Sequence, residues 1–178
     1  MELIGQEAIA NRDKAYAINY PVVRGVIADQ NEIIPIWEQI IFKDLEAYKN
    51  QYQILIAENP IDNKQNRIFL ADTFFDKFSA DAIAIMNGAC LSLFSTGKTK
   101  GLVVEIGEGA SHTIPIFEGF ALQHAALTTD MAGRDITDLL LQGIEKKGIK
   151  IDPNMIEYIK DIKEKMCTVP LSYEKAVS

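Results

Sequence analysis

Residues 101–119, GLVVEIGEGASHTIPIFEG, decide how the middle of the chain folds. An apolar run precedes two glycines, Gly107 and Gly109, and a second stretch of strand-forming residues follows them. Glycine in a turn permits positive φ and the close approach of a ligand. We therefore predict a strand, a glycine-lined turn and a second strand. The ionisable side chains nearest this turn are Glu105, Glu108 and His112.

Two interpretations of this hairpin fit its spacing. Consecutive backbone N–H groups in such a turn form a concave nest for phosphate oxygens, and nearby carboxylates hold a hydrated divalent cation. The hairpin would then be half of a Mg–nucleotide site. The alternative is a plain β-hairpin with two exposed acids. The segment is not a dinucleotide-binding fingerprint, because a third glycine is missing and a strand follows instead of a helix.

Outward from the hairpin, helical and strand-like patterns alternate along the chain. Asp29 is a candidate cap for the first long helix, and Phe74, Phe75 and Phe78 are expected to face the core from the second. The expected order is helix 31–48, strand 52–57, helix 68–78, strand 80–86, helix 87–95, strand 102–106, strands 112–122 and 123–129, helix 133–147, and a last helix from near Pro153 to about Cys167. This alternation predicts an α/β fold in which helices flank a mixed sheet.

Composition excludes several classes of function. The chain has 18 Lys and Arg against 25 Asp and Glu, a formal charge of −7 with no basic run, which disfavours nucleic-acid binding and adhesion to anionic membranes. No stretch approaches 18 uninterrupted apolar residues, and no signal-peptide pattern is present, so an intracellular protein is expected. The two cysteines and two histidines lack the spacing of zinc ligands.

Seven ordered segments resemble actin across nearly the whole chain. They are YPVVRGVI (20–27), IWEQIIF (36–42), AENPIDNKQNR (57–67), LSLFSTGKTKGLVVEIGEG (91–109), HTIPIFEGFAL (112–122), AGRDITD (132–138) and DIKEKMC (161–167). Where conventional actins have Asp-Ser-Gly-Asp-Gly, this chain has residues 105–109, EIGEG. The resemblance implies a partial actin-like fold, of the ribonuclease H-like or sugar-kinase type, with ATP or ADP and Mg held between two halves.

The resemblance also implies roles for individual residues. Glu105 would orient water on the metal, and His112 would lie near the attacking water; these two are the catalytic candidates. The remaining matches are to cofactor-binding positions: Gly107, Glu108 and Gly109 at the phosphates and ribose, Gly133 bordering the nucleotide, and Lys163 with Glu164 beside the adenosine. Without the resemblance, Lys163 and Glu164 would be interpreted as part of a solvated helix face.

The sequence departs from the actin pattern at positions that bear on chemistry. Both hairpin acids are Glu, one methylene longer than Asp, so metal binding would need a shifted backbone or another rotamer. Gly88 occupies the position of the Gln that places the hydrolytic water. The adjacent Asn87 is expected to be a poor substitute, because neighbouring helix positions differ by about 100° around the axis. Hydrolysis of the actin type is therefore in doubt for this chain alone.

The glycine-rich first phosphate loop of actins has no counterpart in residues 1–20. The resemblance divides the chain into a remnant of the first actin half, 1–95, and the start of the second, 96–178, with the phosphate hairpin at 101–121 and a helical outer part at 132–168. An exposed apolar face or sheet edge is expected where the rest of an actin would lie.

Three hypotheses follow. The first is a cytoplasmic, cytoskeletal, actin-like protein that carries part of an ATP–Mg cleft. The second is a non-catalytic module that binds actin, actin-related or actin-binding proteins or a folding chaperone. The third is a fragment of a full-length actin paralogue.

Overall fold

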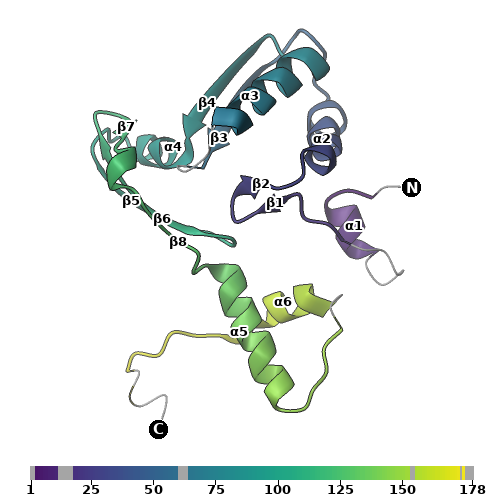
Figure 1. Cartoon of the computed structure of the whole chain (residues 1–178), viewed down its shortest axis with the longest axis vertical. Coiled ribbons are helices and arrows are strands. Elements are labelled where there is room, and N and C mark those ends of the chain that lie inside the picture. Colours follow the sequence, from purple (N-terminus) through teal and green to yellow (C-terminus); the bar gives the residue numbers. More distant parts are fainter. Residues whose placement is uncertain (1–2, 12–17, 60–63, 153–154, 173, 175–178) are drawn as a thin grey trace. The chain divides into compact units, whose positions relative to one another are not determined.

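The chain forms two units. The computed structural model describes residues 3–11, 18–59, 64–152, 155–172 and 174. Contacts divide the chain into unit 1, Met1–Ala132, and unit 2, Gly133–Ser178 (Figure 1), and each is described by itself. The division into 1–95 and 96–178 concerns the correspondence with two halves of an actin, and it stays a prediction.

Unit 1 contains all three sheets of the described part of the chain. Its elements are α1 (Gln6–Ala10), β1 (Val22–Val23), β2 (Val26–Ile27), α2 (Gln30–Glu38), the π-helix η2 (Gln39–Asp44), β3 (Gln53–Glu58), α3 (Lys64–Asp72), the π-helix η3 (Thr73–Lys77), β4 (Ala82–Asn87), α4 (Gly88–Ser95), β5 (Gly101–Ile106), β6 (Ser111–Phe117), β7 (Phe120–Ala121), the 3-10 helix η4 (Gln123–Ala125) and β8 (Leu127–Thr129).

The first layer is a parallel pair of strands, β3 and β4. Their register runs from Gln53 opposite Ala82 to Glu58 opposite Asn87. A parallel connection needs a crossover, which α3 and η3 supply. The side chains of Ile54, Ile56, Ile83 and Ile85 pack against a core formed by Ile41, Leu70, Phe74, Phe78 and Ala80. The predicted alternation of strands and helices is confirmed here.

The helix predicted for 31–48 begins as expected and ends earlier. Asp29 caps α2, because its carboxylate accepts from the backbone N–H groups of Asn31 and Glu32 at 2.8 and 3.1 Å. The helix then widens into η2, where the Leu45 amide bonds the Ile40 carbonyl five residues back. This wider turn rotates later positions off the face expected from a 3.6-residue period. Ile41 is buried, whereas Ile40 and Leu45 are exposed.

The expected core face of the second helix is partly wrong. Phe74 and Phe78 are buried and meet edge to face, with ring centroids 5.4 Å apart. Phe75 is instead exposed, because it directly follows Phe74 in η3 and residues adjacent in a helix point in different directions.

The second sheet contains β5, β6, β7 and β8, all antiparallel, with β5 at one edge. The single strand predicted for 112–122 is wrong. Glu118 and Gly119 have φ of 52° and 84°, the positive pair of a two-residue type I′ turn, which divides the segment into β6 and β7. The strand predicted for 123–129 is also shorter than expected, because η4 takes its first three residues.

Unit 2 contains α5 (Gly133–Lys146) and α6 (Ile156–Met166). Helix α5 begins at Gly133 as predicted, and Gly148 beyond its end has φ 83°, the left-handed conformation common after helix ends. The last helix is confirmed over Ile156–Met166, while its predicted start at Pro153 lies outside the described residues. No helix in the described part of the chain is long and apolar enough to cross a membrane.

Candidate functional site

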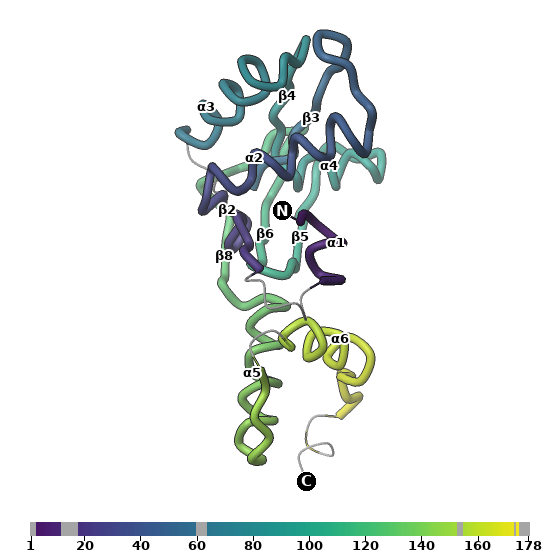
Figure 2. Tube along the Cα trace, turned by 90° about the vertical axis from the view of Figure 1, so that its right-hand side faces the viewer, coloured from purple at the N-terminus to yellow at the C-terminus, as the bar shows by residue number. Residues whose placement is uncertain are grey.

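The predicted hairpin is formed by β5 and β6, which Figure 2 shows side by side. The turn between them closes with a bond of 3.0 Å from the Gly107 amide to the Ala110 carbonyl. In this register Glu105 lies directly opposite His112. Directly opposite residues of an antiparallel pair project from the same face, with Cβ atoms about 4.5–5.5 Å apart. The two catalytic candidates are therefore cross-strand neighbours.

Glu105 and His112 project from the face of the sheet that α4 covers. On this face Val103, Ile114 and Ile116 pack with Ala89, Cys90 and Leu93 of α4. The intervening positions of β5 project from the other face, where Leu102, Val104 and Ile106 are 62%, 59% and 77% exposed. Strand β5 thus has a core and site face and an exposed apolar face, which confirms the expected exposed apolar surface.

Two hydroxyl groups extend the Glu105–His112 pair into a row of four polar residues. Ser92 of α4 donates from Oγ to Glu105 Oε1 at 2.9 Å. On the other side of β6, Thr128 of β8 lies opposite His112, and its Oγ1 is 2.9 Å from His112 Nδ1. We call Ser92, Glu105, His112 and Thr128 the polar row. Within the described part of the chain, Glu105 Oε2 and His112 Nε2 have no hydrogen-bond partner.

The tip of the hairpin differs from the expectation for its glycines. Neither Gly107 nor Gly109 has positive φ. The close approach at Gly109 is made by the protein itself, because a Cβ built there would lie 2.8 Å from the Cα atom of Arg24. Glu108, between the two glycines, is exposed.

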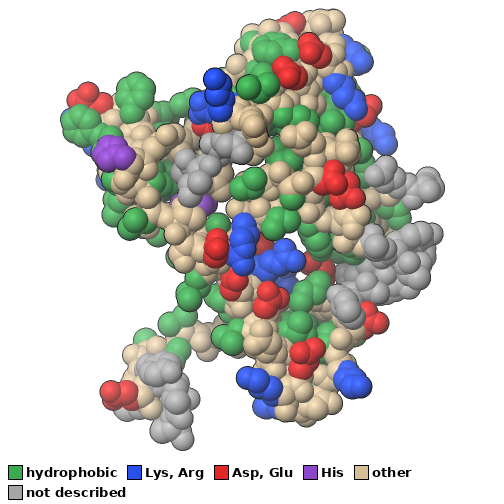
Figure 3. Space-filling model, in the orientation of Figure 1, with side chains coloured by type: hydrophobic (Ala, Val, Ile, Leu, Met, Phe, Trp, Pro, Cys, Tyr) green, Lys and Arg blue, Asp and Glu red, His purple; other side chains and the backbone are tan. Residues whose placement is uncertain are grey.

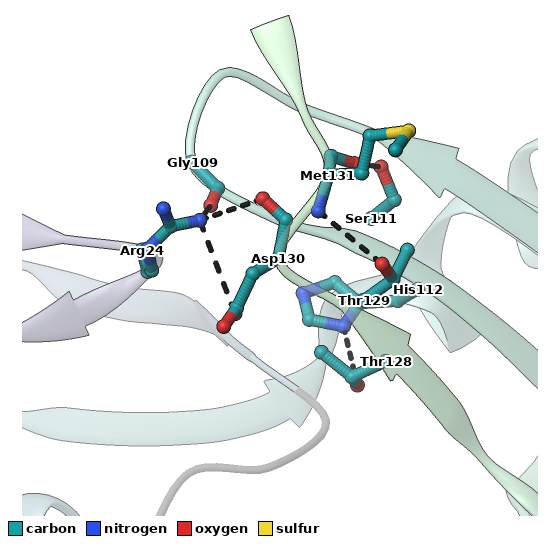
Figure 4. A network of polar contacts seen from close by, with 8 residues as sticks. All are labelled: Arg24, Gly109, Ser111, His112, Thr128, Thr129, Asp130 and Met131. Carbon is teal, nitrogen blue, oxygen red and sulfur yellow. Dashed lines mark hydrogen bonds and ion pairs between the residues drawn. The ribbon is translucent and has the colours of Figure 1, made fainter. Parts of the chain in front are cut away.

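Arg24 belongs to the two-residue turn between β1 and β2, where Arg24 and Gly25 have φ of 50° and 78°. From there its Nη1 atom donates to the carbonyl oxygens of Gly109, at 3.2 Å, and Asp130, at 2.6 Å (Figure 4). The Asp130 carboxylate is farther away, at 3.9 Å, and both side chains are largely solvent-accessible. The guanidinium therefore joins the hairpin tip to the end of β8 mainly through backbone groups.

A second set of bonds holds the segment after β8. Ser111 Oγ donates to the Met131 carbonyl at 2.6 Å, and the Met131 amide donates to Thr129 Oγ1 at 3.2 Å (Figure 4). The first residue of β6 and the residues just beyond β8 are thereby held together near the hairpin tip.

Three predicted cofactor-binding residues lie in unit 2. Lys163 of α6 donates from Nζ to the carbonyl of Gly133 at 2.9 Å, and the Thr137 hydroxyl bonds the same carbonyl at 3.0 Å. Gly133 and Lys163 are thus brought together at the start of α5. Glu164, the next residue of α6, is exposed.

Gly88 and Asn87 lie at the junction of β4 and α4, so they are not neighbours within one helix. Asn87 is the N-cap of α4, with φ −61° and ψ 125°, and its Oδ1 accepts from the Ala89 amide at 2.9 Å. Its Nδ2 is a buried donor without a partner in the described part of the chain. Asn87 and Gly88 are therefore not related by the 100° rotation expected of two neighbouring positions within a helix. Gly88 lies one helical turn before Ser92, on the same face.

Sequence reasoning missed three residues of this region. Ser92 could have been found, because its position four residues after Gly88 places it on the face of α4 that holds the position of the actin Gln. Thr128 and Arg24 carried no comparable signal, because their roles depend on the pairing of β8 with β6 and on the β1–β2 turn.

The parallel β3–β4 layer, the β5–β8 sheet and their flanking helices define a mixed α/β protein with a partial actin-like fold. The family model for Actin matches residues 2–177. The chain belongs to the actin family, and the resemblance found in its sequence is confirmed.

Proposed function

We propose that this chain is a cytoskeletal, actin-like protein of the cytoplasm whose hairpin binds the phosphates of ATP or ADP together with Mg. The observation that carries the proposal is the placement of Glu105 and His112 opposite each other on one face, beside the turn. Each keeps one polar atom without a partner among the described residues. A carboxylate oxygen and an imidazole nitrogen are then free for a hydrated metal and a water molecule.

The turn itself would hold phosphate oxygens through its backbone. The Gly109 amide donates to no described residue, whereas the Gly107 amide closes the turn. A backbone N–H in a short turn is a common phosphate donor. The proposed ligands from the hairpin are therefore the backbone N–H of Gly109 at the phosphates and Glu105 as the outer-sphere metal residue, with Glu108 beside the phosphates as the family resemblance implies.

The residues present fit a hydrated Mg²⁺. Magnesium keeps several waters and binds proteins through one or two carboxylates plus substrate phosphates, and its bound form neutralises phosphate charge. Glu105 has one uncommitted oxygen for such a water. Gly133, Lys163 and Glu164 are proposed to contact the nucleoside, as the family resemblance implies.

Hydrolysis would be slow in this protein. His112 Nε2 is available to accept a hydrogen bond from an attacking water, but Gly88 has no side chain with which to orient that water. Orientation of a reacting water contributes strongly to such reactions, so we propose nucleotide binding with weak turnover.

A second function is favoured by the exposed row Leu102, Val104 and Ile106 on β5. No described strand pairs with the outer edge of β5, so backbone donors and acceptors are available beside an apolar face. Apolar side chains also reach the surface in several places on the face drawn in Figure 3. This surface suits a module that binds actin, an actin-related or actin-binding protein, or a folding chaperone.

Titration of the chain with a fluorescent ATP analogue, with and without Mg²⁺, tests the first function. Micromolar binding that strengthens with Mg²⁺ supports it and overturns a purely non-catalytic module. Absence of binding up to millimolar concentrations overturns it. Glu105→Gln is the matched variant, because it keeps the shape of the side chain and removes its charge. It should weaken binding in the presence of Mg²⁺ but not in its absence, because without the metal the carboxylate only repels the phosphates.

A further inference from the structure

The polar row assigns positioning roles to the two hydroxyl residues at its ends. We propose that Ser92 fixes the orientation of the Glu105 carboxylate and that Thr128 fixes both the ring orientation and the tautomer of His112. The purpose of these contacts rests on the proposed nucleotide function, whereas the Thr128 contact itself can be tested without nucleotide.

Ser92 restricts the side chain of the glutamate at position 105. A Glu side chain has one more rotatable bond than Asp, and fixing a Glu side chain costs up to about 2 kcal/mol of rotamer entropy. The Ser92 hydroxyl donates to Oε1 at 2.9 Å and leaves Oε2 uncommitted. A hydrogen bond to a charged acceptor is stronger than one between neutral groups, so it offsets part of this cost.

Thr128 contacts His112, the other member of the Glu105–His112 pair. Its Oγ1 atom lies 2.9 Å from His112 Nδ1, and the ring makes no other hydrogen bond within the described part of the chain. Thr128 is β-branched and lies on a strand in register with His112, so its hydroxyl is held stiffly. A hydroxyl can accept from Nδ1–H or donate to a bare Nδ1, so the roles in this contact depend on the tautomer. In the proposed arrangement the hydroxyl accepts, so the proton resides on Nδ1 and Nε2 keeps its lone pair. Nε2 is then the ring atom able to accept a proton from water.

The same pattern of contacts holds for both Glu105 and His112. One polar atom of Glu105 and one of His112 bond a hydroxyl from a neighbouring element, and the other atom of each stays available. Since the hydroxyls come from α4 and β8, the pair on β5 and β6 is held from both flanks.

Histidine NMR tests the Thr128 assignment in the full chain without nucleotide. The protein has two histidines, so His124 is an internal reference. Long-range ¹H–¹⁵N spectra recorded about two pH units above the ordinary histidine pKa of about 6.5 report the neutral tautomer. We expect the Nδ1–H tautomer for His112 in the native chain and in Thr128→Ser. In Thr128→Val, which keeps the shape of the side chain, Nε2–H should predominate, and His124 should not change.

An Nε2–H tautomer in the native chain, or an unchanged His112 in Thr128→Val, overturns the assignment. Circular dichroism of each variant shows whether it is folded. If Thr128→Val does not fold, the tautomer of the native chain and of Thr128→Ser still decides the question.

Nucleotide titration tests the Ser92 assignment. Ser92→Ala should reduce the gain in affinity that Mg²⁺ provides by about tenfold, the loss that corresponds to one hydrogen bond to a charged group. Ser92→Thr should restore it. The double variant Ser92→Ala with Glu105→Gln should be no weaker than Glu105→Gln alone, because the hydroxyl acts through that carboxylate. Additive losses in the double variant overturn the assignment.

The two arms separate failure of this inference from failure of the proposed function. A native chain that binds no nucleotide but has the Nδ1–H tautomer refutes the function and supports the Thr128 contact. A native chain that binds Mg–nucleotide with His112 in the Nε2–H form refutes the contact and supports the function.

Discussion

The guanidinium of Arg24 lies directly against the backbone of Gly109. Its Nη1 atom donates to the Gly109 carbonyl at 3.2 Å, and a Cβ added to Gly109 would come within 2.8 Å of the Arg24 Cα atom. Two hairpins far apart in the sequence therefore touch backbone to backbone at the turn of the candidate site. The glycine at this position permits a contact within the protein as well as any contact with a ligand.

Gly109→Ala should therefore destabilise the hairpin tip. The added methyl group meets backbone atoms that cannot rotate away, and overpacking of this kind costs about 1–3 kcal/mol. Urea unfolding followed by circular dichroism measures the change.

The matched control for this variant is Gly88→Ala. A Cβ there makes an ordinary contact, 3.6 Å from the Glu58 carbonyl, so stability should stay the same or rise. Equal stability of the two alanine variants would contradict the close approach.

Arg24→Ala should cost more than Asp130→Asn. The exposed carboxylate at 3.9 Å contributes little, since such surface pairs contribute about 0–1 kcal/mol. The two carbonyl bonds of Arg24 are independent of the Asp130 charge and persist in Asp130→Asn. Urea unfolding of both variants checks the order. Equal destabilisation by both would show that the ion pair dominates.

Gly88→Gln should raise ATP hydrolysis, by about tenfold to a hundredfold, under the proposed function. The new side chain has room at its base and starts on the face of α4 that bears Ser92. Single-turnover hydrolysis at saturating nucleotide separates the chemical step from binding. Gly88→Ala is the control, and it should leave the rate unchanged. A Gln variant that binds nucleotide normally and hydrolyses it no faster contradicts the interpretation of position 88.

Arg67→Ala should be strongly destabilising. The Glu58 carboxylate is only 5% exposed and accepts from both Nε and Nη2 of Arg67. Removal of the partner leaves a largely buried charge uncompensated; because Arg67 itself is 51% exposed, the cost should fall below the about 3–5 kcal/mol of fully buried pairs.

Arg67→Lys should recover only part of this loss, because lysine lacks the planar pair of donors. Thermal unfolding of the native chain and both variants checks this order. A lysine variant as stable as the native chain would show that the paired geometry is unimportant.

The two cysteines should differ sharply in reactivity. Cys90 is buried, and this burial raises the pKa of its thiol, while Cys167 is exposed. A raised pKa lowers the fraction of reactive thiolate at any pH below it. Alkylation at pH 8 followed by peptide mass spectrometry should modify Cys167 first and Cys90 only on unfolding. Rapid modification of Cys90 in the folded chain would contradict its burial.

The order of the elements could be predicted because each carries a local signal. Asp29 caps its helix through its own side chain, and the apolar strands around residues 54 and 84 are bounded by turns. The sequence-based predictions were wrong where the backbone takes a wider helical turn or a tight β-turn that the residue types alone do not indicate. The π-turn at Ile40 changed which residues face the core, and the Glu118–Gly119 turn divided a strand whose composition looked continuous.

The candidate site was predictable only in part for the same reason. Glu105 and His112 follow from the hairpin, since a short turn places them opposite each other. The partners of these residues come from other elements. Ser92 reaches Glu105 only because α4 covers this face of the sheet, and Arg24 reaches Gly109 from a turn 85 positions earlier in the chain.

The side chains of β5 alternate between two faces of the sheet, so the two faces share one backbone. Val103 and Glu105 project toward α4, while Leu102, Val104 and Ile106 project away from it along a strand with one unpaired edge. A strand added along that edge would restrict the same backbone that carries Glu105. Binding at the edge and binding at the hairpin would then change each other's affinity by the same factor, as thermodynamic reciprocity requires.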